Sequence, residues 1–390
     1  TMRTIKNYVR AALPILLGCL LFVACSDDDI AEKGVKEGLP ASLTFKMVVP
    51  DLNDAVVTRA GVEQETALNQ LMFLFYKKSD TSKPAFAKVI DQLGSWRIGS
   101  DGNDNSNRLY TVTISPGETD LNDNELMSGE YYLYALANWG NGFCSYDAEG
   151  YASKSLDELK SAILARESSA NVLDIINNTP MTGIYGRDDG SIEIYEGENS
   201  FGNTDETRVH LRRAVAKVIF NISTVDGITF TPERYSIYHY SQSSTLMERS
   251  GWGGDQGTKP GNLSYEGNNS FSDFEDLAFS DGTPNSFEFY MPENVQRAKD
   301  SNFTDVKMRE KRESETNEKF KYAPEKSTYI VIEGHYNGPR NASSDETAIY
   351  DGDVKYTIQL GDFDATRGGI DNFTIRRNVK YTYNVKVKGV

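Results

Sequence analysis

Strict alternation of apolar and polar residues constrains the fold of this chain more than any other feature of its sequence. The final segment, NVKYTYNVKVKGV at 378–390, carries an apolar side chain at every odd position from 379 to 387 and polar side chains between them. The apolar positions are Val379, Tyr381, Tyr383, Val385 and Val387. Because successive side chains of a strand point to opposite faces, this pattern predicts a strand with one buried face.

The same pattern recurs near the start and in the middle of the chain. The segment SLTFKMVV at 42–49 places four apolar residues on one face, namely Leu43, Phe45, Met47 and Val49. Residues 214–222 alternate in the same way, whereas LNQLMFLFYKK at 68–78 is apolar on both faces. The first two segments predict half-buried strands, and the third predicts a central strand covered on both sides.

Helical signals are few. Ser155 followed by Glu158 predicts a capping box, and the helical face behind it carries Leu156, Leu159 and Ile163. The charged segment KMREKRESETNEK at 307–319 predicts a solvated loop or a short exposed helix. Tyrosine and glycine are frequent, with 22 and 32 residues, as in β-structure with many turns. We therefore expect an all-β fold with one or few short helices.

The length of the chain predicts two domains, because 390 residues exceed what one hydrophobic core usually holds. A segment rich in Gly, Asn and Asp, EGENSFGNTDET, separates two series of strand patterns. We place the boundary close to its end. This gives an N-terminal β-sandwich at 60–206 and a C-terminal β-sandwich at 207–390.

Residues 1–24 have the pattern of an export signal. The basic stretch MRTIKNYVR precedes an apolar run of 14 residues, AALPILLGCLLFVA, which is too short to span a bilayer. Cys25 follows small residues and precedes SDDD, as at the acylation site of a bacterial lipoprotein. An ordinary signal peptide followed by an unrelated cysteine is the alternative. In both cases we expect residues 25–59 to hold a linker and the first strand.

The sequence predicts no catalytic, cofactor or metal site. The three histidines, His210, His239 and His335, are scattered and lack metal-ligand spacing. After export and acylation, Cys144 would have no cysteine partner. The formal net charge of −16 disfavours nucleic acid as a partner. Trp252, in the Gly-rich stretch SGWGGDQG, offers a ring that could stack on a sugar.

Several segments, taken in their order along the chain, resemble the fimbrillin superfamily, the Mfa-like and FimA-like subunits of type V pili. They are the Cys25 lipobox, VVTRAG, YYLYALANWG, LRRAVAKVIFNI, FYMPEN and NFTIRRNVKYTYNVKVKG. The resemblance implies two tandem transthyretin-like β-sandwiches in a lipoprotein of the outer membrane, displayed at the surface in a fimbrium. It implies a structural and adhesive subunit without enzymatic activity or cofactor.

The resemblance also implies a route of assembly. An Arg-specific protease would cut between Arg59 and Ala60 and release the strand of Leu43, Phe45, Met47 and Val49. A strand from another fimbrial subunit would then fill the trough, because an exposed sheet edge is a template for β-augmentation. Residues 379–389 would be that donor strand. The surface ligand is not implied, and a non-polymerising surface lipoprotein that binds glycans is the alternative from a different functional class.

Overall fold

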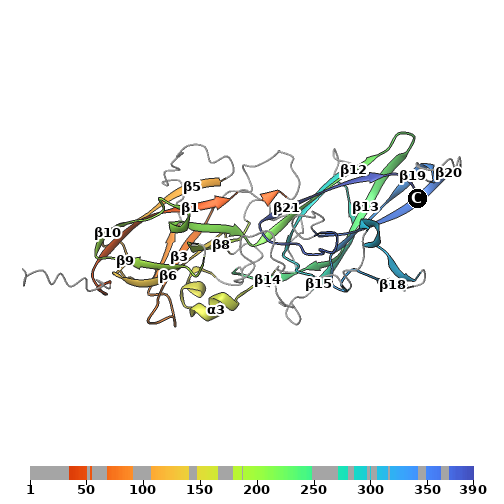
Figure 1. Ribbon diagram of the computed structural model, residues 1–390. Helices are drawn as coiled ribbons and strands as arrows, with labels where there is room; N and C mark the ends of the chain where they lie inside the picture. Colours follow the sequence, from red (N-terminus) through yellow and green to blue (C-terminus); the bar gives the residue numbers. More distant parts are fainter. Residues whose placement is uncertain are drawn as a thin grey trace, which may run out of the picture.

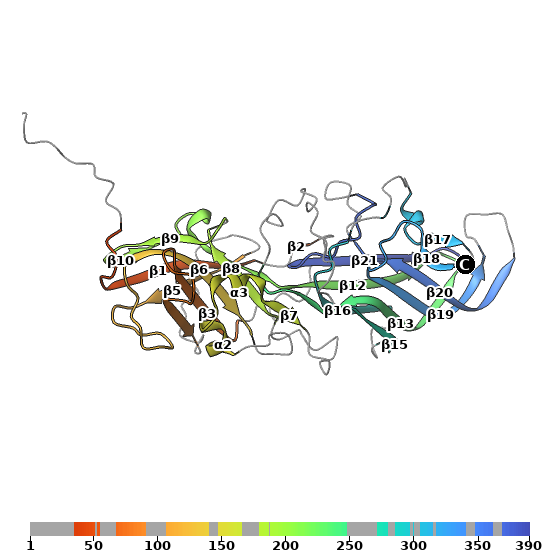
Figure 2. The same ribbon diagram turned by 90° about the horizontal axis from the view of Figure 1, so that it is seen from below.

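The structure of the chain is a computed structural model. The structure describes residues 35–50, 53–54, 68–90, 107–139, 147–165, 179–186, 188–247, 271–279, 285–296, 299, 305–314, 317–340, 348–361 and 369–390. These residues form an elongated, mostly β molecule with two groups of strands lying end to end (Figures 1 and 2). The expected all-β class is confirmed, and the arrangement is sandwich-like.

The first group of strands forms one large sheet. Among the described residues its order is β10-β1-β11-β8-β6-β3-β4, with β5 also paired to β1 and β9 to β6. The strands are β1 (Ala41–Pro50), β3 (Leu71–Lys77), β4 (Phe86–Ile90), β5 (Asn107–Ile114), β6 (Gly129–Ala137), β8 (Met181–Tyr185), β9 (Ser191–Ile194), β10 (Gly197–Ser200) and β11 (Val209–Arg213). The pairs of β1 with β10 and β11 are parallel, and the other pairs in this sheet are antiparallel.

Strand β3 contributes to two separate clusters of buried side chains. Its odd-numbered apolar residues, Leu71, Phe73 and Phe75, belong to the cluster that also holds the buried face of β1. Its even-numbered ones, Met72, Leu74 and Tyr76, belong to a second cluster that includes residues of the helices α2 (Ala148–Ala152) and α3 (Leu156–Ser161). The predicted central strand covered on both sides is therefore confirmed.

The capping box predicted at Ser155 is present. The Glu158 amide donates to Ser155 Oγ at 3.2 Å, and the Ser155 amide donates to the Glu158 carboxylate at 2.8 Å. The helix is shorter than the pattern indicated, because Ala162 has an extended backbone with ψ 141°. Ile163 begins strand β7 (Ile163–Ala165), so its expected place on the helical face is wrong.

The second group of strands forms two facing sheets with a common core. Their orders are β16-β12-β21-β2 and β15-β13-β19-β20. The strands are β2 (Asn53–Asp54), β12 (Val215–Thr224), β13 (Thr229–Ser241), β15 (Phe271–Ala278), β16 (Ser286–Pro292), β19 (Tyr329–Pro339), β20 (Ile349–Gln359) and β21 (Val379–Val387). Ala216, Val218, Phe220 and Ile222 of β12 point into the core, as their alternation predicts.

Short elements complete the described fold. They are β14 (Ser243–Thr245), which pairs with β7, the hairpin β17 (Arg312–Ser314) and β18 (Asn317–Phe320), and the 3-10 turns η3 (Asp205–Thr207) and η4 (Val306–Met308). The charged segment at 307–319 thus contributes to a turn and a hairpin. The expectation of a loop or an exposed helix there is wrong. No helix among the described residues is both long and apolar enough to cross a membrane.

The chain passes from the first sheet to the second between β11 and β12. Strand β11 pairs with β8 and β1, and β12 pairs with β16 and β21, so the change of sheet falls at Ala214. This is later than the expected boundary at 206/207. Ala214 and Val215 are buried in the cluster that also contains Met72 and Leu74 of β3. The two groups of strands therefore share a hydrophobic contact where they meet.

Candidate functional site

Strand β1, which carries the expected displaced segment, is an interior strand of the first sheet. On one side it runs antiparallel to β5 from Leu43↔Ile114 to Pro50↔Asn107. On its other side β10 pairs with its first half and β11 with Met47 and Val48. We call the space between β5 on one side and β10 and β11 on the other side the β1 slot. If β1 left, the slot would present unpaired backbone groups on both of its walls.

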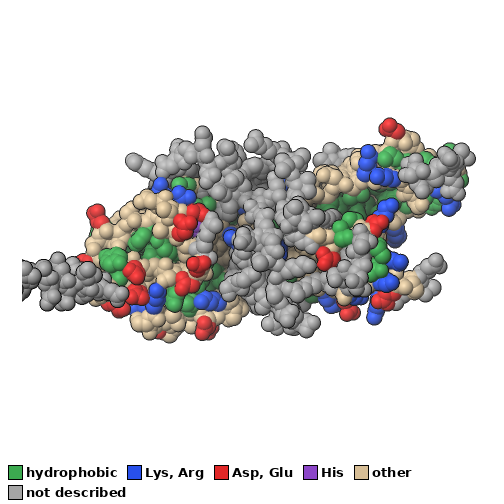
Figure 3. Space-filling view, viewed as in Figure 1, with side chains coloured by type: hydrophobic (Ala, Val, Ile, Leu, Met, Phe, Trp, Pro, Cys, Tyr) green, Lys and Arg blue, Asp and Glu red, His purple; other side chains and the backbone are tan. Residues whose placement is uncertain are grey.

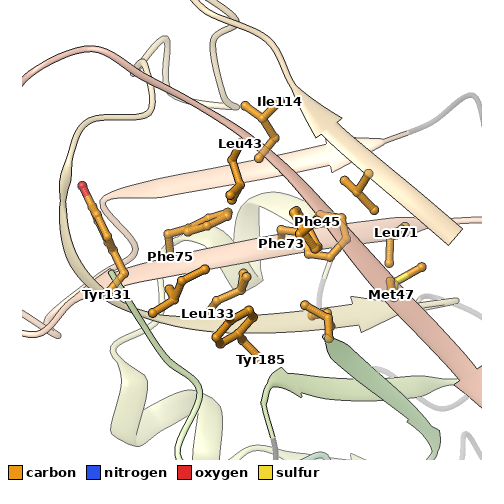
Figure 4. Packing of buried hydrophobic residues seen from close by; sticks show 14 of the residues in the cluster. Leu43, Phe45, Met47, Leu71, Phe73, Phe75, Ile114, Tyr131, Leu133 and Tyr185 are labelled. Carbon is orange, nitrogen blue, oxygen red and sulfur yellow. The ribbon is translucent and has the colours of Figure 1, made fainter. Parts of the chain in front are cut away.

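The apolar face of β1 is fully buried. Leu43, Phe45, Met47 and Val49 have exposed fractions between 0% and 1%. Figure 4 shows Leu43, Phe45 and Met47 amid the side chains of β3 and β6, and the Phe45 and Phe73 rings meet edge to face at 5.0 Å. Burial of four such side chains contributes roughly 6–12 kcal/mol in total. The strand is therefore a large part of the first core, and its displacement stays a prediction.

Strand β21, which carries the expected donor residues, is also an interior strand. It runs parallel to β12 from Lys217↔Lys380 to Thr224↔Val387. On its opposite edge β2 pairs with Val379 and Lys380. Tyr381, Tyr383 and Val387 are buried in the second core, and Val379 and Val385 pack against it partly buried. The predicted buried face is confirmed, and the donor role stays a prediction.

Hydroxyl groups fasten β21 to the loops around it. Tyr383 Oη accepts from the Gly361 amide at 2.9 Å and donates to the Gly361 carbonyl at 2.8 Å. Tyr381 Oη accepts from the Arg376 amide at 2.9 Å. The Phe220 and Tyr383 rings stack with their centroids 4.8 Å apart. In this structure β21 thus covers its own sandwich.

The residues just before β21 anchor it where the two groups of strands meet. Arg377 and Glu293 form a buried ion pair, in which Arg377 Nε donates to Glu293 Oε1 at 2.9 Å. Arg377 Nη1 also donates to the Leu246 carbonyl at 2.9 Å. Asn378 Oδ1 accepts from Arg213 Nη1 at 3.2 Å. We call Arg213, Glu293, Arg377 and Asn378 the junction network.

A second buried arginine, Arg309, holds the chain upstream of the junction network. It donates to the Leu360 carbonyl at 2.9 Å and to the Asn372 carbonyl at 3.0 Å. Its guanidinium lies 3.9 Å from the centre of the Phe373 ring. Burial lowers the pKa of Arg309 to about 10. The charge pattern of 307–319 gave no sign of this residue, because its partners lie about fifty residues or more along the chain.

Charged side chains pair across the exposed face of the β15-β13-β19-β20 sheet. Arg234 lies 3.2 Å from Asp276 and also pairs with Glu333, which pairs in turn with Lys355. Hydrogen bonds from Lys355 and Arg234 lower the pKa of Glu333 despite its partial burial. Figure 3 shows acidic and basic side chains interspersed over the described part of one face. Such pairs keep the outer surface of a sheet polar.

The three histidines lie in three different places. His210, on β11, has Nε2 2.7 Å from the Asp205 carbonyl, and His239 has Nδ1 3.1 Å from the Ser327 carbonyl. His335 lies between two carboxylates, 2.7 Å from Asp351 and 3.1 Å from Asp353. Within the described ranges no group of three His, Cys, Asp or Glu residues has a geometry that could hold a metal ion.

Several predicted positions lie outside the described residues. They are the lipidation residue Cys25, the cleavage residues Arg59 and Ala60, Cys144, and Trp252 of the glycan-stacking alternative. The two strands with predicted roles are both described. The predicted displaced strand β1 lies in the first core and the predicted donor strand β21 in the second, so the structure does not bring them together. It joins them indirectly, because β2 follows β1 closely and pairs with β21.

Comparisons with known proteins give one family model and several solved structures. Residues 289–385 match a family described as a domain of unknown function, DUF4906. No curated protein matches this chain. A putative cell adhesion protein from Parabacteroides distasonis is 17% identical, with 89% of each chain covered and a TM-score of 0.47.

Another putative cell adhesion protein from Parabacteroides distasonis is 14% identical, with 90% of this chain and 92% of that chain covered and a TM-score of 0.49. The tip fimbrial protein Mfa3 from Porphyromonas gingivalis, solved with a C-terminal truncation, is 14% identical, with 89% and 95% covered and a TM-score of 0.48. The solved structures to which this chain is similar thus include a fimbrial tip protein and putative cell adhesion proteins.

Proposed function

We propose that this chain is a structural and adhesive subunit of a surface fimbria that polymerises by strand exchange. In this proposal β1 is a temporary occupant of the β1 slot, and a strand from another subunit replaces it. The observation that carries the proposal is the position of β1. It is an interior strand with a fully buried apolar face, and Arg59 follows it in the sequence.

Chain connectivity supports the proposal. Every residue of β1 precedes Arg59, and β3 follows it, so one cut after Arg59 would leave β1 attached to the first sheet by non-covalent contacts alone. A vacated slot would offer two unpaired walls and an apolar trough. An incoming strand with alternating apolar residues would pair with both walls and fill the trough. Exchange of one such strand for another needs no nucleotide and no metal.

The donor in this proposal is β21 of another copy or the corresponding strand of a related subunit. Its residues Val379, Tyr381, Tyr383, Val385 and Val387 present the alternation that the slot requires. The other partners are an Arg-specific protease and the outer membrane, reached through lipid on Cys25. The adhesive role at the cell surface is part of the proposal, because the solved structures similar to this chain are described as a fimbrial tip protein and a putative cell adhesion protein.

Limited proteolysis tests the proposal directly. We expect an Arg-specific protease to remove residues up to Arg59 from the purified chain and to yield a ladder of heat-resistant oligomers on gels. The matched control is Arg59→Lys, which keeps the positive charge but not the cleavage specificity. We expect this variant to stay monomeric. A wild-type chain that is cut after Arg59 and remains a stable monomer would contradict the proposal and favour the glycan-binding alternative.

A further inference from the structure

Strand β2 links the removable N-terminal segment to the second core. It consists of Asn53 and Asp54, whose backbones run parallel to Val379 and Lys380 at the start of β21. The same segment therefore supplies β1 to the first sheet and β2 to the second. This contact joins the expected displaced strand to the expected donor strand within one molecule.

The two edges of β21 are held unequally. Among the described residues, β12 accompanies β21 from Lys380 to Val387, whereas β2 meets its other edge only at Val379 and Lys380. Without β2, Val379 and Lys380 would lose the strand that pairs with them on this edge. Edge strands open more readily than interior strands, because half of their backbone groups lack a partner in the sheet.

The position of β2 matters more than its length. Asn378, directly before β21, has a positive φ of 56° and belongs to the junction network. Its amide donates to the Val215 carbonyl at 2.9 Å. If β21 swings out of its sheet while this network holds, the chain must bend just after Asn378. Val379 and Lys380, the residues that would bend, are the two that β2 pairs with.

A two-residue strand pairs weakly by itself, so its pairing with β21 depends on a neighbouring element that keeps it nearby. Strand β1 does so, because Pro50 ends β1 and Asn53 begins β2. Three Cα steps separate these residues, and the chain can span at most about 11 Å between them. While β1 is seated, β2 therefore stays at a high effective concentration beside β21. When β1 leaves, β2 leaves with it.

We propose that β2 is a latch on β21, so that loss of the N-terminal segment both empties the β1 slot and frees the pivot of β21. The inference rests on the proposed function for its biological meaning, but the latch itself is a property of the uncut monomer. It would couple the two halves of strand exchange. A subunit could offer its own β21 only after its own β1 segment had been released.

Hydrogen exchange in an uncut background tests the latch apart from polymerisation. The starting chain carries Arg59→Lys, and the test variant adds Asn53→Pro and Asp54→Pro, which removes the two backbone N–H groups of β2. We expect amide exchange across 379–387 to become about tenfold faster, the effect of losing one or two ladder hydrogen bonds. Exchange across 43–49 in β1 should stay unchanged. The matched control, Asn53→Ala with Asp54→Ala, keeps the backbone donors and should behave like the starting chain.

Two results would overturn the latch. One is equal exchange across 379–387 in the proline and alanine variants. The other concerns the wild-type chain after cleavage and removal of the released fragment, while it is still monomeric. Unchanged exchange across 379–387 in this monomer would show that β21 does not depend on the segment. This second measurement does not require the proline variant to fold. Failure of the proposed function would instead appear as a cut chain that forms no oligomers, whatever its exchange rates.

Discussion

At the scale of single residues, two buried arginines set the starting point of β21. Arg309 ties Leu360 and Asn372 together, and Arg377 joins Glu293 to the carbonyl of Leu246. Both guanidinium groups bind backbone carbonyls, which only a side chain with several fixed donors can do at once. The strand that follows is therefore positioned by polar contacts at its start and by apolar contacts along its length.

The ion pair of Arg377 and Glu293 gives the first prediction. We expect Arg377→Met to lower the free energy of unfolding by about 3–5 kcal/mol, because it leaves the Glu293 carboxylate buried without its cation. Urea denaturation of the purified chain measures this loss. The neighbouring Arg376→Gln is the matched control and should cost less than about 1 kcal/mol, because the Arg376 side chain is only partly buried. Equal losses for the two variants would contradict the structural role of the pair.

His335 gives a prediction about pH. Its hydrogen bonds to Asp353 and Asp351 raise its pKa, so the folded chain binds this proton more tightly than the unfolded chain. The resulting stabilisation is complete below the unfolded pKa of about 6.5, and it disappears as the pH rises through the folded pKa. We expect His335→Gln to lower Tm at about pH 5.5 and to leave it unchanged at about pH 9.

Thermal unfolding at the two pH values, in low and in high salt, checks the prediction for His335. The side chain is exposed, so salt should reduce the difference at low pH. A loss of Tm that is the same at both pH values would show that His335 acts through packing and not through its charge.

At the scale of elements, the sequence predicts best the strands whose burial follows from the pattern of their own residues. The buried faces of β1, β12 and β21 follow from alternation, and the double coverage of β3 follows from its continuous apolar run. The prediction was wrong at Ile163 and at 307–319. In both segments the deciding contact comes from a distant part of the chain, β14 for Ile163 and the segment around Asn372 for Arg309.

The candidate site was predictable only in part for the same reason. The sequence indicates which face of β1 and of β21 is buried. It does not indicate that β1 lies between β5 and β10, or that β21 lies between β12 and β2, because strand neighbours depend on pairing across long stretches of sequence. The junction network and β2 had no local signal. Their residues are Arg, Asn, Asp and Glu, which ordinarily occupy the surface.

The β1 slot gives a prediction at this scale. We expect a synthetic peptide of residues 41–50 to bind the cut chain, raise its Tm and suppress the oligomer ladder, because it restores both walls and the apolar trough. A peptide with Phe45→Asp should do neither, since the Phe45 side chain lies fully buried against Phe73. Differential scanning fluorimetry and gels provide the two measurements.

The control for this experiment changes the opposite face of the same peptide. Thr44 is partly exposed and points away from the Phe45 side of the strand, so a peptide with Thr44→Ser should bind like the parent. Equal binding by the Phe45→Asp peptide would mean that the slot does not select its occupant by the apolar face of the strand.

At the scale of the whole molecule, the contacts between the two groups of strands determine whether the chain unfolds as one cooperative unit. Among the described residues several contacts join them, in addition to the junction network. Strand β7 pairs with β14, Thr182 Oγ1 donates to the Leu246 carbonyl at 3.2 Å, and one hydrophobic cluster draws residues from both groups. Strand β2 adds a further contact, which would be lost with the N-terminal segment. We therefore expect the contact between the two groups of strands to be weaker in the cut subunit than in the uncut one.

The shared cluster predicts how the molecule unfolds. Leu246 and Met247 are buried in the same cluster as Met72, Leu74 and Tyr76 of the first sheet. They therefore belong to the contact between the groups and not to the cores that hold β1 and β21. We expect the wild-type chain to unfold in a single calorimetric transition. The double variant Leu246→Ala with Met247→Ala should unfold in two transitions, because the cavity weakens the contact between the groups by about 2–5 kcal/mol per side chain. The exposed Leu121→Ala is the control and should leave one transition. A single transition in the double variant, shifted as a whole to lower temperature, would show instead that the polar contacts and β7 couple the two groups without this cluster.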